Sequence, residues 1–590
     1  MTPGSRGWSW LVLATLVLVA GCKSMTSKPL LQVRGPEQVL AEAPPTERTF
    51  VWASGGAEFL DPALVSESAG HHLMLNCFVG AYQYNRGDGP PVPALASHHE
   101  VTPDGLTWTI HLRPGIVWSD GKAIEAEDFV WSWRRVLAPQ TASRAAQLLW
   151  FVAGAKAYNE GSDPDPAHVG VRALDSRTLQ VQLAEPVAFF DHLLAEMPYA
   201  PTPRHVVEKF GTAWTEPDHI VVSGPFTLSH YESRKRAELK KNPKFIDAAE
   251  VWLDKVVVLD TESERTALDW YEVGRTHWLG DVSLPMDQVP ALRTAGRPDF
   301  RTEKKLCSYY FSLRMDQPAL RDVRVRQALA LTVDKERLAL HILQGGQPVA
   351  DNAVPDLFRK THGYIPPKGL GFDPARGRQL LADAGYPQGL GLPPIELLHN
   401  TGEGHRIIAE FVQRSWQENL GVRIELLNME WGTLLKTLQA GDFAIGRSSW
   451  CADYPDPLTF LEVFHSQSPS NYSGYKSAAY DGLLQQIRST ARHQDRNPLI
   501  TQAEELLMRE LPLLPMYHYT SSTLVKPWVL GLEPNLQDMH PMMYVRFADA
   551  TEWAQIQRGQ PVHLPPLPGP PSAELPAGVT PTAPNPTGSH

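Results

Sequence analysis

A strand–helix–strand pattern between residues 394 and 428 constrains the fold more than any other feature. An apolar strand-like run, PIELLHN, is followed by RIIAEFVQRSWQENLG, whose apolar residues recur on one helical face, and then by a second strand-like run, VRIELLN. Two strands joined by a helix within about 35 residues form a βαβ unit, which requires a sheet with parallel neighbours. We therefore predict an α/β fold with a parallel or mixed sheet and helices packed on it.

The rest of the chain alternates between the same two patterns. WTIHLRPGIVWSDGKAI (108–124) contains two short alternating runs with a hairpin-type turn, and FDPARGRQLLADAGYP (372–387) is a helix with Asp373 as its N-cap. At 590 residues the chain is long enough for two to four domains at about 150 residues each. Its net charge of -11, without long blocks of like charge, argues against nucleic acid as the main partner.

The N-terminus predicts export. The apolar run from Trp8 to Gly21 is shorter than a bilayer span of about 20 residues, so residues 1–21 are predicted to be a signal peptide. The run ends in LVAGC, which resembles the bacterial lipobox and makes Cys22 the candidate for lipidation and the mature N-terminus; the alternative is an uncleaved anchor. Residues 22–47 are then expected to be a tether.

The remaining cysteines are Cys77, Cys307 and Cys451, so at least one of them stays unpaired. An exported protein can hold a disulfide, but the spacing does not choose among three possible pairs. Cys77 lies in the apolar stretch LMLNCFVG, where a small buried thiol is expected.

No local motif of a hydrolase, nucleotide-binding loop or CxxC metal site is present, so we predict neither an enzyme nor a cofactor. The adjacent histidine pairs at 71–72 and 98–99 would point to opposite faces of a strand and chelate poorly, so no metal site is predicted and ordinary polar surface is expected. Residues 561–590 contain ten prolines, and residues 549–590 are expected to be a disordered tail.

The stretch RSSWCADYPDP (447–457) concentrates polar and aromatic side chains at the end of an apparent strand. Arg447, Ser449, Cys451 and Asp453 have the same parity and would project from one face of an extended segment. Taken alone, an aspartate in ADYPDP is a common turn former, and the turn interpretation is kept for Asp456.

Five blocks of the chain, several of them long, resemble the periplasmic oligopeptide-binding proteins of ABC importers, in order from about residue 48 to 548. The blocks are TPDGLTWTIHLRPGIVWSDGKAIEAEDFVWSWRRVLAPQTAS, VEKFGTAWTEPDHIVVSGPFTL, LCSYYFSLRMDQPALRDVRVRQAL, NMEWGTLLKTLQAGDFAIGRSSWCADYPDP and LVKPWV. The same fold also serves receptors for dipeptides, murein peptides, nickel or haem, and a murein peptide, metal or haem receptor is the alternative function.

The resemblance implies a two-lobed clamshell with an extra domain on the first lobe, acting as a monomer. Lobe I would contain residues 48–78, 201–306 and 519–548, the additional domain 79–200 and lobe II 307–518, with the hinge near 306 and 518. An oligopeptide would bind between the lobes, and the closed protein would be presented to the permease of the importer.

The resemblance also implies roles for single residues. Asp453 would hold the α-ammonium of the peptide, and Cys451 would form a disulfide with Cys307. Ser449 and Cys451 lie in the segment expected to pair with the peptide backbone.

Trp450 and Trp431 would lie near the side-chain pockets, or else in the lobe core. Arg447 and His405 match positions that hold the peptide carboxylate; the alternatives are a structural ion pair for Arg447 and solvated surface for His405. Leu343 and Ser312 depart from the charged residues of relatives, so the preferred peptide length is not predicted.

Overall fold

The structure is a computed structural model that describes residues 34–565 except 66, 188, 491 and 492. Its largest feature is a ten-stranded sheet in the order β14-β13-β15-β12-β16-β11-β1-β10-β9-β8. The bounds of these strands, in that order, are Ile424–Met429, Ile395–Asn400, Ile445–Cys451, Phe300–Leu313, Leu513–Val525, Trp278–Leu279, Thr49–Ser54, Lys255–Asp260, Arg236–Lys241 and Phe226–Glu232. Both parallel and antiparallel neighbours occur, which confirms the predicted α/β class with mixed sheets.

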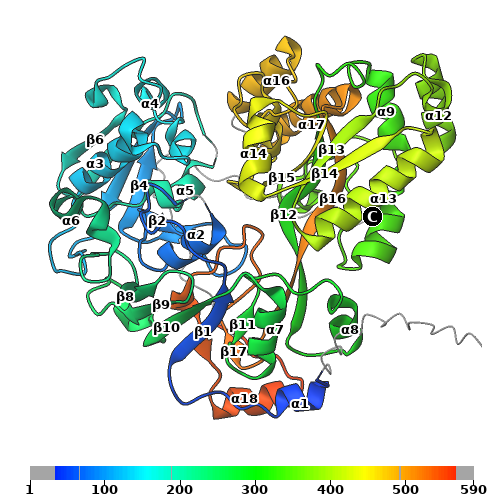
Figure 1. Cartoon of the computed structure of the whole chain (residues 1–590). Coiled ribbons are helices and arrows are strands. Elements are labelled where there is room, and N and C mark those ends of the chain that lie inside the picture. Colours follow the sequence, from blue (N-terminus) through cyan, green and yellow to red (C-terminus); the bar gives the residue numbers. More distant parts are fainter. Residues whose placement is uncertain (1–33, 66, 188, 491–492, 566–590) are drawn as a thin grey trace, which may run out of the picture.

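Two long strands, β12 and β16, connect the lower part of the molecule to its upper right part (Figure 1). They pair antiparallel, but the ladder is irregular between Lys304 and Ser308, opposite Thr520 and His518. An irregularity of this kind bends a strand. It coincides with the two chain crossings predicted near residues 306 and 518, while the exact domain boundaries remain a prediction.

The predicted βαβ unit is confirmed in the upper right part. Strands β13 and β14 pair parallel, and α13 (Glu403–Leu420) connects them. The helix buries Ile408, Val412 and Trp416, the face that its apolar spacing indicates. The indole Nε1 of Trp416 donates to the carbonyl oxygen of Leu329 at 2.8 Å, which fixes α13 against α9 (Val323–Leu331). Neighbouring helices here are α12 (Pro374–Asp383), α14 (Trp431–Ala440), α15 (Leu458–Leu461), α16 (Ala478–Arg488) and α17 (His493–Glu510).

A second sheet lies at the upper left and belongs to the segment predicted as the additional domain. It has the order β4-β5-β7-β6 and is antiparallel throughout. Its strands are Ala96–Val101, Thr107–Leu112, Thr178–Gln182 and Val171–Asp175. Helix α3 (Ala126–Leu137) contacts β6 and β7 and buries Phe129 and Trp133 (Figure 1).

Three expectations about the ends of the chain and its histidines are wrong in part. The predicted tether, residues 22–47, includes a packed segment, because α1 (Pro36–Leu40) buries Val39 completely. The predicted tail begins too early, because Asp549 caps α18 (Ala550–Gln557) and Trp553 is buried. Residues 566–590 lie outside the described residues, as do Cys22 and the predicted signal peptide.

The histidine pair at 71–72 lies on α2 (Ser68–Met74), not on a strand or on the polar surface. His72 is buried and bonds the Asp281 carboxylate at 2.9 Å and the Asp538 carbonyl oxygen at 2.7 Å. Among the described residues, no helix has the length and apolarity needed to cross a bilayer.

Candidate functional site

The disulfide predicted from the resemblance is present. Cys307 on β12 and Cys451 on β15 occupy directly opposite ladder positions, and their sulfur atoms are bonded. Cys77 is a free thiol with no exposed surface, as its apolar setting predicts. The cross-link joins the last residue of β15 to β12, so it fixes the strand end from which the candidate site continues.

Asp453 lies two residues beyond β15, in a turn organised by Thr459. The Thr459 hydroxyl oxygen accepts the Asp453 backbone N–H at 3.2 Å and the indole N–H of Trp450 at 3.3 Å. The Asp453 side chain is half-buried. Burial, with the nearby charge of Glu462, raises the pKa of the Asp453 carboxyl to about 7. No lysine, arginine or histidine in the described part of the chain forms an ion pair with it.

Asp456, three residues further on, does form an ion pair within the protein. Its carboxylate is buried and forms two bonds with the Arg496 guanidinium, at 2.6 and 3.0 Å. It also accepts the backbone N–H of Leu458 at 3.0 Å, which confirms its predicted role in the turn. One acid of the ADYPDP segment is therefore neutralised within the protein, and the other has no cation.

Side chains from the upper left part of the molecule lie close to Asp453. Tyr84 donates its hydroxyl to the Glu196 carboxylate; burial raises the pKa of both groups, and the charge of Asp453 raises it further. Burial is the larger cause for Glu196, whose pKa rises to about 8. Phe189 stacks on Tyr454 with ring centroids 3.9 Å apart.

Arg488 of α16 connects the same two parts of the molecule. Its Nε lies 2.6 Å from Glu462 and 3.7 Å from Glu185. The segment around Asp453 is therefore enclosed by residues of two sequence regions. Sequence reasoning missed Tyr84, Phe189 and Glu196; an acid inside the apolar run LLAEMPYA was the available signal for Glu196.

A second charged group lies at the other end of the same strand segment. Arg447 is buried, its Nη2 donates to the Tyr519 hydroxyl at 2.7 Å, and its guanidinium lies 4.9 Å from the centroid of the Tyr309 ring. Its Nε has no hydrogen-bond partner, and no described carboxylate pairs with it, so the structural ion-pair alternative is not supported. The ring of Trp431 is 46% exposed and 5.7 Å from the guanidinium.

His405 stacks on Tyr309 at 5.7 Å, and its Nδ1 is buried without a partner. Burial, followed by the charge of Arg447, lowers the pKa of His405 to about 3. The imidazole is therefore neutral at neutral pH, and it is not solvated surface. Arg447 is the cation of this group, and His405 offers a neutral hydrogen-bonding edge beside it.

One edge of β15 is open between these two groups. On one side, β15 pairs with β12 from Ile445 to Cys451. On the other side, β13 pairs only with Ile445 and Gly446. No described strand covers the backbone from residue 447 to 451 on that side, which includes Ser449, Trp450 and Cys451. An open strand edge can accept another extended chain through main-chain hydrogen bonds.

Comparisons with known proteins agree with this geometry. Residues 90–472 match the family described as bacterial extracellular solute-binding proteins, family 5 Middle. Periplasmic oligopeptide-binding protein OppA of Escherichia coli is 34% identical over 493 residues, which cover 82% of this chain and 90% of the relative. A probable deoxycholate-binding periplasmic protein, YgiS of E. coli, is 34% identical over 477 residues, covering 80% of this chain and 88% of the relative.

The solved structure of the E. coli murein tripeptide binding protein MppA superposes with a TM-score of 0.77 at 30% identity, over 86% of this chain and all of that one. The matched residues include parts of both halves of the molecule. They also include Arg447 and most of the residues around it. The chain belongs to the bacterial extracellular solute-binding proteins of family 5.

Proposed function

We propose that the protein captures oligopeptides between its two halves outside the cytoplasm and delivers them to the permease of an ABC importer. The α-ammonium of the peptide pairs with Asp453, the peptide backbone pairs with the open edge of β15, and the peptide carboxylate meets Arg447. The naming of OppA as an oligopeptide-binding protein supports this ligand class.

The observation that carries the proposal is the acid without a cation. Burial of this unpaired carboxylate disfavours its charged form, and together with the nearby charge of Glu462 it raises the pKa of Asp453 to about 7. An incoming ammonium would stabilise the ionised carboxylate by pairing with it. Asp456, whose carboxylate is already paired with Arg496, cannot serve in this way.

The backbone of the peptide supplies the second contact. Ser449 and Cys451 present main-chain groups at the open edge of β15, and every peptide can pair with such an edge whatever its sequence. The exposed ring of Trp431 beside Arg447 would offer aromatic surface to peptide side chains, whereas Trp450 packs against the hydrophobic core. Recognition of this kind selects for a peptide with free ends and little for its sequence.

The two charged groups also suggest a ligand length. Arg447 and Asp453 are six residues apart, so their backbones are separated by at most roughly 20 Å in an extended chain. The side chain of Arg447 covers part of the distance between the two backbones, and a peptide of roughly three to five residues would span the rest.

The same geometry bears on other ligands. A bile acid such as deoxycholate carries a carboxylate that Arg447 could bind, but it has no ammonium for Asp453. A murein peptide has a free amine and would satisfy both groups, so Asp453 does not separate it from ordinary oligopeptides. The unpaired acid therefore favours a peptide over a bile acid or haem, and among the described residues no group of three metal-ligand side chains includes Asp453.

The division of the chain belongs to the same proposal. Residues 48–78, 201–306 and 519–548 form lobe I, 79–200 the additional domain and 307–518 lobe II, moving about the irregular segment of β12 and β16. A lipid on Cys22 holds the monomeric protein at the membrane of the cell envelope. Because the site contains binding groups and no paired nucleophile and base, we propose a receptor without catalytic activity.

Titration calorimetry of the full-length protein with an unmodified tetrapeptide and with deoxycholate tests the ligand class. The proposal expects saturable binding of one peptide per chain and no competition by deoxycholate. Saturable binding of deoxycholate that excludes the peptide would show that the chain is a bile-acid receptor.

A further inference from the structure

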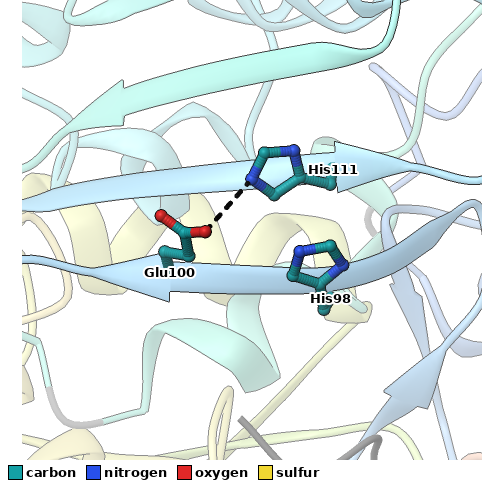
Figure 2. A group of neighbouring side chains, drawn as sticks. All are labelled: His98, Glu100 and His111. Carbon is teal, nitrogen blue, oxygen red and sulfur yellow. Dashed lines mark ion pairs between the residues drawn. The ribbon is translucent and has the colours of Figure 1, made fainter. Parts of the chain in front are cut away.

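A group of chelating side chains lies on the second sheet, away from the peptide site. His98 on β4 and His111 on β5 occupy directly opposite ladder positions, and Glu100 lies two residues beyond His98 on the same face (Figure 2). His99 points to the other face, where it packs on Trp108. The three side chains therefore converge although the adjacent pair at 98–99 does not.

The distances suit a metal ion. The two imidazole rings stack with centroids 4.5 Å apart, and one donor atom from each of the three residues lies within 4.8 Å of the others. Around a first-row ion with bonds of about 2.0 to 2.2 Å, donor atoms lie roughly 3.3 to 4.3 Å apart. His98 and Glu100 are exposed, so small side-chain rotations can close the remaining gap.

One donor atom of the group has no partner of its own. Nε2 of His111 is buried, forms no hydrogen bond and faces the Glu100 carboxylate from 3.8 Å (Figure 2). By contrast, His205 on the same half of the molecule bonds Asp120 at 2.7 Å. A buried imidazole nitrogen without a partner is costly, and a metal ion beside it would satisfy it.

Ser97 orients the second imidazole. Its hydroxyl donates to the backbone carbonyl oxygen of His111 at 3.1 Å, so its oxygen is free to accept from Nδ1 of His98 at 3.0 Å. This arrangement puts the proton of His98 on Nδ1 and the lone pair on Nε2, which is the form that binds metal. Histidine ligands in proteins commonly donate their other ring nitrogen in this way.

We propose that His98, His111 and Glu100 bind a divalent first-row transition ion, namely Zn²⁺, Ni²⁺ or Cu²⁺. Two imidazoles and one carboxylate suit these ions, whereas Mg²⁺ and Ca²⁺ prefer oxygen ligands alone. The ion joins the edge strand β4 to β5 on the solvent face of the sheet. The site is independent of the peptide contacts and does not depend on the proposed function.

Calorimetric titration of the full-length protein with ZnCl₂ tests the site through four single substitutions. His98→Ala and His111→Ala should each weaken binding at least ~10-fold, since loss of even an outer partner of a ligand costs 10- to 100-fold. Ser97→Ala removes the outer partner of His98 and should weaken binding by no more than His98→Ala does. His168→Ala is the matched control, because exposed His168 bonds Asp163 at 2.7 Å but has no second imidazole beside it.

Three results would overturn the proposal. If Zn²⁺ affinity is unchanged in either His98→Ala or His111→Ala, the group is only an ion pair between His111 and Glu100 and not a metal site. If the wild type shows no saturable Zn²⁺ binding, the metal site does not exist. Cu²⁺ electron paramagnetic resonance of the wild type should show hyperfine coupling to two imidazole nitrogens, and coupling to one nitrogen would contradict the site.

Discussion

Replacing Asp453 should remove the contact on which peptide binding depends most. No described residue supplies a cation to this carboxylate, and burial with the charge of Glu462 raises its pKa to about 7, so the ammonium of a peptide would be its ion-pair partner. Truncating one partner of a buried charge pair costs about 2 to 5 kcal/mol. Because Asp453 is half-buried, we take the lower value, which corresponds to a rise of about 30-fold in Kd.

The assay is a double-mutant cycle measured by calorimetry at pH 7.5. Wild type and Asp453→Ala are each titrated with one tetrapeptide and with its N-acetylated form, which lacks the ammonium. Acetylation should cost the wild type ~2 kcal/mol or more and the variant much less, because the partner of the ammonium is already absent. Asp453→Asn keeps the shape without the charge and should also bind poorly.

Asp456→Asn is the matched control for this cycle. It should lower the unfolding temperature, because it breaks the buried pair with Arg496, but it should leave the cost of acetylation unchanged. Equal affinity of the wild type for both peptides would mean that Asp453 does not bind the ammonium and is only a turn residue.

Three further results are expected. Because the folded pKa of Asp453 lies above its usual value of 3.8, its contribution to the stability of the peptide-free protein falls as pH rises from about 4 to 7. Peptide binding at pH 6 should therefore release a proton from the wild type that Asp453→Asn does not release. Calorimetry in buffers of different ionisation enthalpy measures this release, and equal release by both proteins would contradict the prediction. Reducing the Cys307–Cys451 bond, which spans 144 residues, should lower the unfolding temperature because at most about 5 kcal/mol of folding stability is lost. The Cys77→Ala variant should show the same fall in unfolding temperature with reductant. An unchanged unfolding temperature in both proteins would contradict the bracing role of the disulfide. Cys22→Ser should release the protein from membranes with peptide affinity intact, and fractionation that still finds lipid-labelled variant would exclude Cys22 as the anchor.

The fold was predictable where local patterns decide it. The apolar face of α13 and the strand-like runs on either side of it predicted the βαβ unit, because burial selects the residues of one helical face. The start of the tail was not predicted, because proline content beyond residue 560 outweighed the capping box of Asp549 and Glu552. Helix α2 was missed because a histidine pair in a short apolar stretch carries no clear period.

The candidate site was predictable mainly along one strand. Parity and family resemblance together pointed to Arg447, Cys451 and Asp453, which lie on or just beyond β15, and the resemblance alone pointed to His405 on α13 and Trp431 on α14. Glu196 could not be assigned to the same place, because its approach depends on how two distant parts of the chain pack. The pairing of His98 with His111 depends on a ladder irregularity between Ala96 and His98, which shifts the register and which no sequence pattern reveals.

Native mass spectrometry of freshly purified full-length protein would show directly whether the chain carries oligopeptides. Wild-type protein should appear with a ladder of bound masses that fragment as peptides with free amino ends, and Asp453→Ala protein should be largely without them. A single bound mass that is not a peptide, retained equally by Asp453→Ala, would show that the chain is not an oligopeptide receptor.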